Sequence, residues 1–229
     1  MRLYAIADLH LSLYKHKPMD IYGAQWKEHH LTIQQNWLKT IKDNDTVLIG
    51  GDISWAMTLE EAIYDLDFIH NLTGRKILIR GNHDYWWKSV TELNSLYNDM
   101  IFLQNNYIND TEYSICGTRG WACLEEGIST EHDRKMYRRE LIRLEMSLKA
   151  AVANGAKKII VLLHYPPMSE KKEASGFTNL IKQYPVDKVV YGHLHSGHHH
   201  FAVNETIDGV EYILTSSDFL DFCPIPIAI

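Results

Sequence analysis

The sequence predicts an α/β protein whose functional side chains gather where its buried strands end. Five apolar runs of strand length recur along the 229 residues, and metal-ligating side chains follow each of them. Buried strands of α/β proteins are near-continuous apolar stretches, and ligands bind outside their carboxyl ends. The pattern therefore predicts one convergent metal site. The five runs are Leu3–Ala7, Thr46–Ile49, Lys76–Ile79, Lys157–Leu163 and Lys188–Tyr191.

Strands and helices alternate in the first half of the chain. A polar loop after the first run leads to a predicted helix over about residues 25–42, which has apolar side chains at helical spacing. Thr58 and Glu61 have the spacing of a capping box and predict a second helix to about Leu72. A third helix is predicted over residues 88–97. The order in this half is βαβαβα.

The second half predicts a second sheet and a long helix. Residues 101–117 form short runs broken by Asn-rich turns, which predict antiparallel strands. An apolar stripe predicts a helix over about residues 131–153, with Gly155 just past its end. A short helix near residues 177–183 and a hairpin around Asp208-Gly209 complete the expected elements.

Composition favours one domain over residues 1–229. The chain is 45% hydrophobic, and no repeat, linker or low-complexity stretch divides it. The net charge of -6 includes no long block of like charge. This composition argues against a dedicated nucleic-acid binder, so we expect no stable nucleic-acid complex, although a nucleotide substrate fits.

The sequence favours a reducing compartment. Its three cysteines are odd in number and show no C-x-x-C spacing, which argues against a disulfide framework or a zinc knuckle. The strand that follows Met1-Arg2 leaves no room for a signal segment, and no stretch approaches about 18 apolar residues. We expect a soluble, cytoplasmic protein without a membrane segment; the oligomeric state is open.

The first two strand ends carry candidate metal ligands. Asp8 and His10 lie two apart in an extended segment, so both side chains project to the same side. Asp52 follows two glycines, where the backbone can approach an ion closely. A carboxylate can also bridge two cations. Taken alone, these residues would more often be solvated loop or turn residues.

The segment Gly81-Asn82-His83-Asp84 is more specific. Asn82 offers a neutral oxygen ligand, and an acid directly follows His83. A histidine held by an acid suits a proton donor, so we assign catalytic roles to His83 and Asp84. The alternative is that Asp84 caps the following helix.

Histidines follow the last two strands. His164 ends an apolar run, and His193 and His195 repeat the two-residue spacing of the first strand end. A lone His164 would more often be a core residue. The whole candidate set has three oxygen ligands, four imidazoles and no thiolate, and its size suggests two ions of Mn²⁺, Fe, Zn²⁺ or Ni²⁺. Its members are Asp8, His10, Asp52, Asn82, His164, His193 and His195.

This ordered set resembles the signature of the calcineurin-like metallophosphoesterases, with D-x-H, G-D, G-N-H-D, a single His and G-H-x-H in turn. The resemblance spans residues 8–195 and implies a four-layer αββα sandwich, two mixed β-sheets flanked by helices, with two metals at the strand carboxyl ends. It further implies two ligand sets that share Asp52 as a bridge. These are Asp8, His10, Asp52 and His195 for one metal, and Asp52, Asn82, His164 and His193 for the other.

The chain departs from one branch of that family. Protein serine/threonine phosphatases continue the second motif with Asp-Arg-Gly, whereas Ile53 and Ser54 follow Asp52 here. The intact ligand and proton-donor positions favour an enzyme. We expect hydrolysis of a phosphomonoester or phosphodiester by a metal-bridging hydroxide, with His83 protonating the leaving oxygen and Asp84 orienting it. The alternative is a metal-loaded interaction module with little turnover.

Substrate contacts are less specified, and a small phosphoester or a nucleotide is the expected substrate. Trp86, Arg119 and Arg138 are candidate contacts, because rings and guanidinium groups suit a cleft that binds phosphates. Packing and ordinary surface charge explain the same residues equally well. We leave His16, His29, His30 and the run His198–His200 out of the predicted site.

Overall fold

The structure is a computed structural model that describes residues 1–15, 17–110, 112–124 and 127–228. Its first sheet has the strand order β11-β1-β2-β3-β4, and its second has the order β5-β6-β7-β8-β10-β9. The first sheet contains β1 (Leu3–Ile6), β2 (Thr46–Ile49), β3 (Arg75–Ile79), β4 (Met100–Leu103) and β11 (Ile225–Ala228). The second contains β5 (Tyr107–Asp110), β6 (Tyr113–Thr118), β7 (Ile159–Leu163), β8 (Val186–Tyr191), β9 (Thr206–Ile207) and β10 (Val210–Leu214).

Both sheets are mixed. In the first, β1 to β4 are parallel and β11 pairs antiparallel with β1. In the second, β6, β7, β8 and β10 are parallel, and β5 and β9 are antiparallel edge strands. Parallel strands place their carboxyl ends on the same edge of a sheet, which brings the loops after them together.

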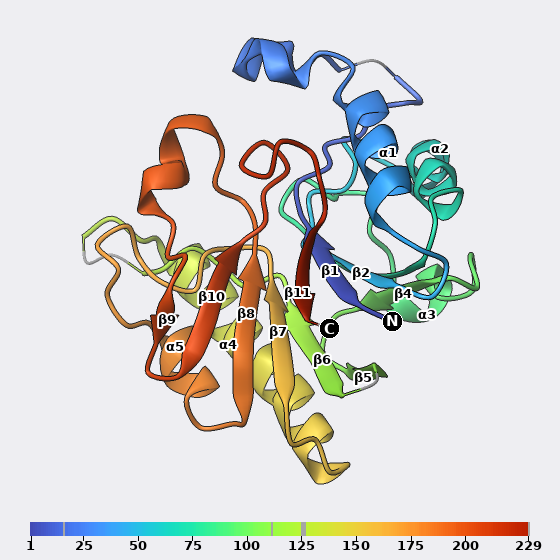
Figure 1. Ribbon diagram of the computed structural model, residues 1–229. Coiled ribbons are helices and arrows are strands. Elements are labelled where there is room, and N and C mark those ends of the chain that lie inside the picture. The colour runs from blue at the N-terminus through green and yellow to red at the C-terminus, as the bar shows by residue number, and fades with distance from the viewer. Residues whose placement is uncertain (16, 111, 125–126, 229) are drawn as a thin grey trace.

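Helices cover the outer faces of the two sheets. Helices α1 (His29–Thr40) and α2 (Leu59–His70) lie beside the first sheet, and α4 (Glu131–Ala153) and α5 (Gly176–Ile181) lie against the second (Figure 1). The remaining helical segments are α3 (Val90–Leu93) and the 3-10 turns η1 (Asp20–Tyr22), η2 (Ala24–Trp26) and η3 (Ser196–Phe201). This arrangement is the four-layer αββα sandwich that the family resemblance implied.

Side chains alternate between two cores along each central strand. In β1, Tyr4 and Ile6 face the helices, whereas Leu3 and Ala5 pack into the apolar layer between the two sheets. The period of two that a strand imposes explains this division. Because both faces are buried, these strands are apolar over most of their length, and that property made them recognisable in the sequence.

Local elements differ from the sequence prediction in four places. The helix predicted over residues 25–42 begins at His29, because η2 and a left-handed Glu28 (φ 49°) precede it. The helix predicted over residues 88–97 has only four residues. Strand β4 joins the first sheet in parallel with β3, and the sequence analysis missed β11.

Other elements match the prediction closely. The long helix α4 spans residues 131–153 as expected, and Gly155 follows it with φ of 87°. The hairpin around Asp208-Gly209 is present as β9 and β10. Within the described residues, no helix combines the length and the apolar character that crossing a membrane requires.

Candidate metal centre

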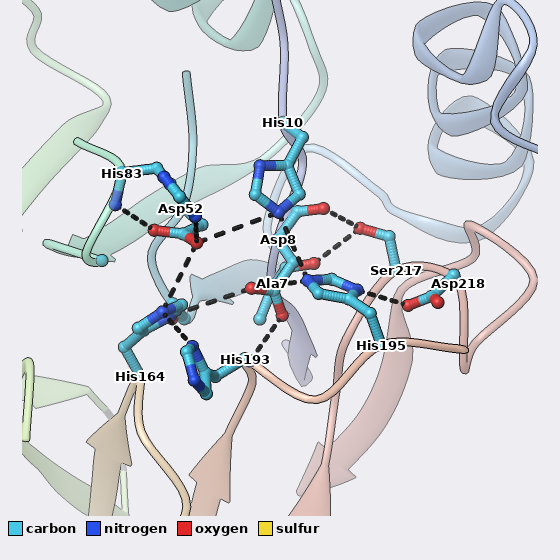
Figure 2. A network of polar contacts seen from close by, with 12 residues as sticks. Ala7, Asp8, His10, Asp52, His83, His164, His193, His195, Ser217 and Asp218 are labelled. Atoms are coloured by element: carbon cyan, nitrogen blue, oxygen red, sulfur yellow. Dashed lines mark hydrogen bonds and ion pairs between the residues drawn. The ribbon is translucent and has the colours of Figure 1, made fainter. Parts of the chain in front are cut away.

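The loops after β1, β2, β3, β7 and β8 meet at one edge of the sandwich. There the imidazoles of the predicted set point toward two buried carboxylates, Asp8 and Asp52 (Figure 2). Their ligand atoms form two groups, each with all atoms within 4.8 Å of one another. The first group is Asp8, His10 and His195, and the second is Asp52, His164 and His193.

Asp52 faces both groups. Its Oδ2 atom lies 3.8 Å from Nε2 of His10 and 3.5 Å from Nε2 of His164. The other oxygen, Oδ1, accepts a hydrogen bond of 2.8 Å from the amide of His83. One carboxylate oxygen is therefore held in place while the other points between the two groups.

The second group brings hydrogen-bond acceptors face to face. Nδ1 of His164 lies 3.0 Å from the carbonyl oxygen of Gly50, so Nδ1 carries the ring proton and Nε2 has a lone pair. That lone pair lies 2.7 Å from Oδ1 of Asn82. Two acceptors at this distance repel each other unless a cation joins them, so the arrangement fits a metal ion.

The first group also brings ligand atoms close together. Nδ1 of His195 donates to Oδ1 of Asp218 at 2.8 Å, and its Nε2 lies 3.3 Å from Nε2 of His10. Oδ1 of Asp8 is buried and has no hydrogen-bond partner among the described residues. A divalent cation would satisfy all three of these atoms.

The pKa shifts in the centre also indicate a site that favours positive charge. Burial and the Asp8 carboxylate raise the pKa of Asp52 to about 8. Burial alone would lower the pKa of His195, but the carboxylates of Asp8 and Asp218 raise it to about 10. Both shifts favour protons at positions where a bound metal would supply the charge instead.

The backbone of the centre is unusual. Four of the predicted ligands have positive φ angles, namely Asp8 at 60°, His10 at 45°, Asp52 at 49° and His193 at 74°. Non-glycine residues adopt this region rarely, and such strain concentrates at functional sites.

Two glycines make the close approach of these loops possible. A Cβ atom on Gly81 would lie 2.2 Å from the amide nitrogen of Asp52, and one on Gly192 would lie 2.5 Å from Oδ2 of Asp8. A side chain at either position would clash with a neighbouring loop, which explains the glycine in the G-N-H-D and G-H-x-H segments.

Asp84 has a different position from the one expected. Its carboxylate accepts hydrogen bonds from the amides of Ile53, Ser54 and Gly81, and from the indole of Trp86, at 2.7–3.1 Å. These four donors occupy the carboxylate, and the described hydrogen bonds include none between Asp84 and the His83 ring. Asp84 thus ties the second motif loop to the third instead of orienting His83, and Ser89 is the residue that caps α3.

His83 lies at the accessible side of the centre. Its side chain is 35% exposed, and its Nε2 lies 3.9 Å from Oδ2 of Asp52. Burial, His164 and Lys17 lower the pKa of His83 to about 4. The ring packs against Trp55, with 4.3 Å between the ring centroids.

The three candidate substrate contacts lie in three different environments. Trp86 is fully buried in the apolar core against Trp87, so it does not line the cleft. Arg119 lies beside the centre, because its carbonyl oxygen accepts hydrogen bonds from the amides of His164 and Tyr165, both at 3.0 Å. Arg138 lines a groove along α4 that contains none of the predicted metal ligands.

A small pocket of about 210 Å³ opens onto the centre. Besides ligands and His83, it is lined by Met19, Tyr22, Trp26 and Trp55. The Trp55 ring stacks on the ligand ring of His10 at 4.9 Å. These four residues come from loops and short 3-10 turns, and the sequence analysis assigned none of them to the site. Trp26 was expected in the helix predicted over residues 25–42.

The sequence analysis left several histidines out of the predicted site, and the structure shows contacts of two of them. His16 lies outside the described residues. Both ring nitrogens of His29 face backbone carbonyl oxygens, those of Trp26 and Leu9. Nε2 of His199 lies 3.4 Å from Oδ2 of Asp218, so one member of the 198–200 run approaches the outer side of the centre.

The sequence analysis missed two polar residues that follow β10. Asp218 holds His195, and Oγ of Ser217 donates to the carbonyl oxygens of Ala7 and Asp8, each at 2.6 Å (Figure 2). They could have been found by the rule that identified the ligands, because they lie just beyond another apolar strand.

Comparison with known proteins identifies the family. The family model described as calcineurin-like phosphoesterase matches residues 1–197, and the chain belongs to this family. Membership supports metal-dependent hydrolysis of phosphoesters as the general class of activity. The family also typically binds divalent metals, in agreement with the two ligand groups described above.

Individual similar proteins are distant. The Gene 66 protein of Mycobacterium phage L5 is 36% identical over 78 residues, which are 34% of this chain and 37% of the phage protein. The chain thus matches little more than a third of that relative's length.

Two solved structures share the fold. One is TT1561 of Thermus thermophilus, at 12% identity and a TM-score of 0.58, covering 99% of this chain and 98% of that one. The other is phosphopantetheinyl hydrolase from Mycobacterium tuberculosis, at 15% identity and a TM-score of 0.52, covering 94% and 88% of the two chains.

Proposed function

We propose that the chain is a dinuclear metal-dependent phosphohydrolase that cleaves phosphomonoester or phosphodiester bonds. The observation that carries this proposal is the position of Asp52, whose Oδ2 lies 3.8 Å from His10 and 3.5 Å from His164, one residue from each ligand group. A carboxylate oxygen placed between two ligand groups suits a bridge between two cations.

Asp8, His10, Asp52 and His195 would hold one ion, and Asp52, Asn82, His164 and His193 would hold the other, so that Asp52 belongs to both sets. This set of nitrogen and oxygen ligands suits Mn²⁺, Fe, Zn²⁺ or Ni²⁺. When bound, such ions supply Lewis acidity and an activated water for attack at phosphorus.

The chain's own residues complete the reaction. His83 lies at the open side of the centre and donates a proton to the leaving oxygen. Its ring is neutral near pH 7, and the negative charge of a bound phosphoester raises its pKa toward the value that a donor needs. Asp84 contributes by fixing the loops that carry Asp52 and His83.

The proposed substrate is a small phosphoester or a nucleotide, and the proposal includes no stable nucleic-acid complex. The pocket of about 210 Å³ supports a small leaving group. A cytoplasmic location is also part of the proposal. It is supported by Cys116 and Cys223, which carry thiols and no disulfide.

Turnover of p-nitrophenyl phosphate and bis-p-nitrophenyl phosphate tests the proposal, with metal analysis of the same preparations. We expect turnover with at least one of Mn²⁺, Fe²⁺, Zn²⁺ and Ni²⁺, and we expect Asp52→Asn to lose metal content and turnover together. The exposed Asp43 provides a matched control, because Asp43→Asn removes the same charge away from the centre. Full metal content without turnover on either ester would favour the interaction module instead.

A further inference from the structure

Three arginine side chains lie around one buried carboxylate next to the metal centre, and a fourth arginine lines the same cavity. Nη1 of Arg143 lies 2.8 Å, Nη2 of Arg139 3.1 Å and Nη2 of Arg119 3.9 Å from Oε1 of Glu140. Arg80 lines the same small cavity. We refer to Arg80, Arg119, Arg139 and Arg143 as the arginine cluster.

The arginine cluster has more positive charge than its carboxylate can neutralise. Glu140 is fully buried and also accepts a hydrogen bond from Oγ1 of Thr118. A single carboxylate balances one guanidinium group, so the other three remain in excess. The side chains of Arg139 and Arg143 are 44% and 29% exposed, so an anion from solution can reach them.

The positive charge continues along α4. Arg134, Lys135 and Arg138 join Arg139 and Arg143 in lining a groove of about 690 Å³. Within the part of the chain that the structure describes, those first three cations form no ion pair, and Glu131 is the acidic side chain in the groove. In a protein of net charge -6, this concentration of cations attracts anions locally.

The arginine cluster is attached to the loops of the metal centre. The carbonyl oxygen of Arg119 accepts from the amide of the predicted ligand His164 at 3.0 Å. Nε of Arg80 donates to the carbonyl oxygen of Asp84 at 3.1 Å, and Arg80 lies two residues before Asn82.

A row of rings connects the two places. The guanidinium of Arg119 lies 4.5 Å from the ring centre of Trp121. The Trp121 ring lies 5.5 Å from that of Tyr165, which in turn lies 4.3 Å from His193. The row therefore offers flat surfaces between the ligand His193 and the arginine cluster.

We propose that the arginine cluster is a second anion-binding site, which holds the phosphate groups of a nucleotide-type substrate that are not being hydrolysed. This inference rests on the proposed function, because it assumes that the reacting phosphate lies in the metal centre. Guanidinium forks match phosphate oxygens in pairs, and several of them can hold a chain of phosphates.

Calorimetric titration of inorganic tripolyphosphate into the metal-loaded full chain tests the proposal. We expect saturable binding that Arg139→Gln and Arg143→Gln each weaken about tenfold, because each removes a charge-assisted contact. Lys149→Gln is the matched control, since it removes one charge from the same helix outside the groove. The control should leave the affinity unchanged.

A second variant covers the possibility of misfolding, because losing Arg139 or Arg143 leaves the buried Glu140 with less compensation. Arg134→Gln/Arg138→Gln changes only side chains that line the groove outside the arginine cluster, and we expect about threefold weaker binding with a smaller dependence on salt. Equal affinities in all these proteins, or no tripolyphosphate binding by the wild type, would overturn the proposal.

Binding of a ten-nucleotide single strand tests the alternative that the groove holds a nucleic acid. If the strand binds more tightly than tripolyphosphate and depends on the same arginines, the groove serves a nucleic-acid strand and the proposal fails.

Turnover of bis-p-nitrophenyl phosphate distinguishes failure of the second anion site from failure of the proposed hydrolysis. Turnover without tripolyphosphate binding removes only the second anion site, whereas binding without turnover on any ester removes the proposed hydrolysis.

Discussion

Nδ1 of His195 donates a hydrogen bond of 2.8 Å to Oδ1 of Asp218. The bond fixes the orientation of the ring, so Nε2 is the nitrogen that faces the centre, 3.5 Å from Oδ1 of Asp8. Oδ2 of Asp218 also accepts from the amide of Ser196 at 2.9 Å. A carboxylate behind a metal-binding imidazole orients the ring and raises its basicity.

Replacing Asp218 should therefore weaken metal binding. We expect Asp218→Ala to lower the affinity for one of the two ions by about 10- to 100-fold. Asp218→Asn should have a smaller effect, because its amide oxygen can still accept from Nδ1. Competition with a chromogenic chelator measures both, and Asp43→Asn serves as the control. Unchanged affinity in Asp218→Ala would mean that the hydrogen bond does not support the centre.

Gly81 is the second sensitive position. A Cβ atom there would lie 2.1 Å from Oδ1 of Asp52 and 2.2 Å from its amide nitrogen, so either the third loop or Asp52 must move. We expect Gly81→Ala to lose the ion that Asp52 and Asn82 hold, and to lower the free energy of unfolding by about 1–3 kcal/mol.

Gly197 provides the matched control, because a Cβ atom there meets nothing within 4 Å. Metal analysis and urea unfolding of both variants give the comparison. Normal metal content in Gly81→Ala would show that the loops tolerate a side chain and that the close approach is not required.

The convergence of the ligands could be predicted because it depends on two regular features. Strands buried on both faces are apolar over most of their length, and parallel strands end on one edge. Both features are visible in a single sequence, as the runs before Asp8, Asp52 and His164 illustrate. The sequence analysis assigned β4 to the wrong sheet and missed β11. The pairing partners of both strands are set by tertiary packing and not by a local pattern.

The supporting residues were harder to predict because neighbours in sequence can diverge in space. His83 and Asp84 are adjacent, which suggested a pair, but the unsatisfied amides of residues 53, 54 and 81 take the Asp84 carboxylate. A buried carboxylate costs free energy unless such donors surround it, so this competition decides its direction. Trp55 comes from a loop, where side-chain direction follows no period.

His83 should be required for difficult leaving groups. We expect His83→Ala to lower turnover of an alkyl phosphate by about 10²- to 10⁴-fold, because an alkoxide needs a proton to depart. Turnover of a nitrophenyl ester should change much less, since nitrophenolate leaves without one. Metal content should stay unchanged, because His83 belongs to neither ligand group.

The ratio of the two rates is the measurement, and His70→Ala provides a control outside the pocket. An equal loss on both esters would contradict a proton-donor role and would indicate that His83 acts in binding or in positioning Asp52 instead.

Asp65 should make stability depend on pH. Burial raises the pKa of its carboxyl to about 6, although hydrogen bonds from Ser54 and the amide of Leu13 oppose the rise. Between about pH 4 and 6 the folded state consequently binds more protons at Asp65 than the unfolded state does. The free energy of unfolding should therefore fall as pH rises through this window, by about 3 kcal/mol at most.

Asp65→Asn should remove this contribution while its amide oxygen still accepts from Leu13. Urea unfolding at several pH values between 4 and 7 measures the effect, with Asp43→Asn as the matched control. Relative to wild type, Asp65→Asn should become progressively more stable as pH rises from 4 to 6, and the difference should then level off. Parallel stability curves for the two proteins would mean that the Asp65 carboxyl titrates in the folded state as it does in the unfolded chain.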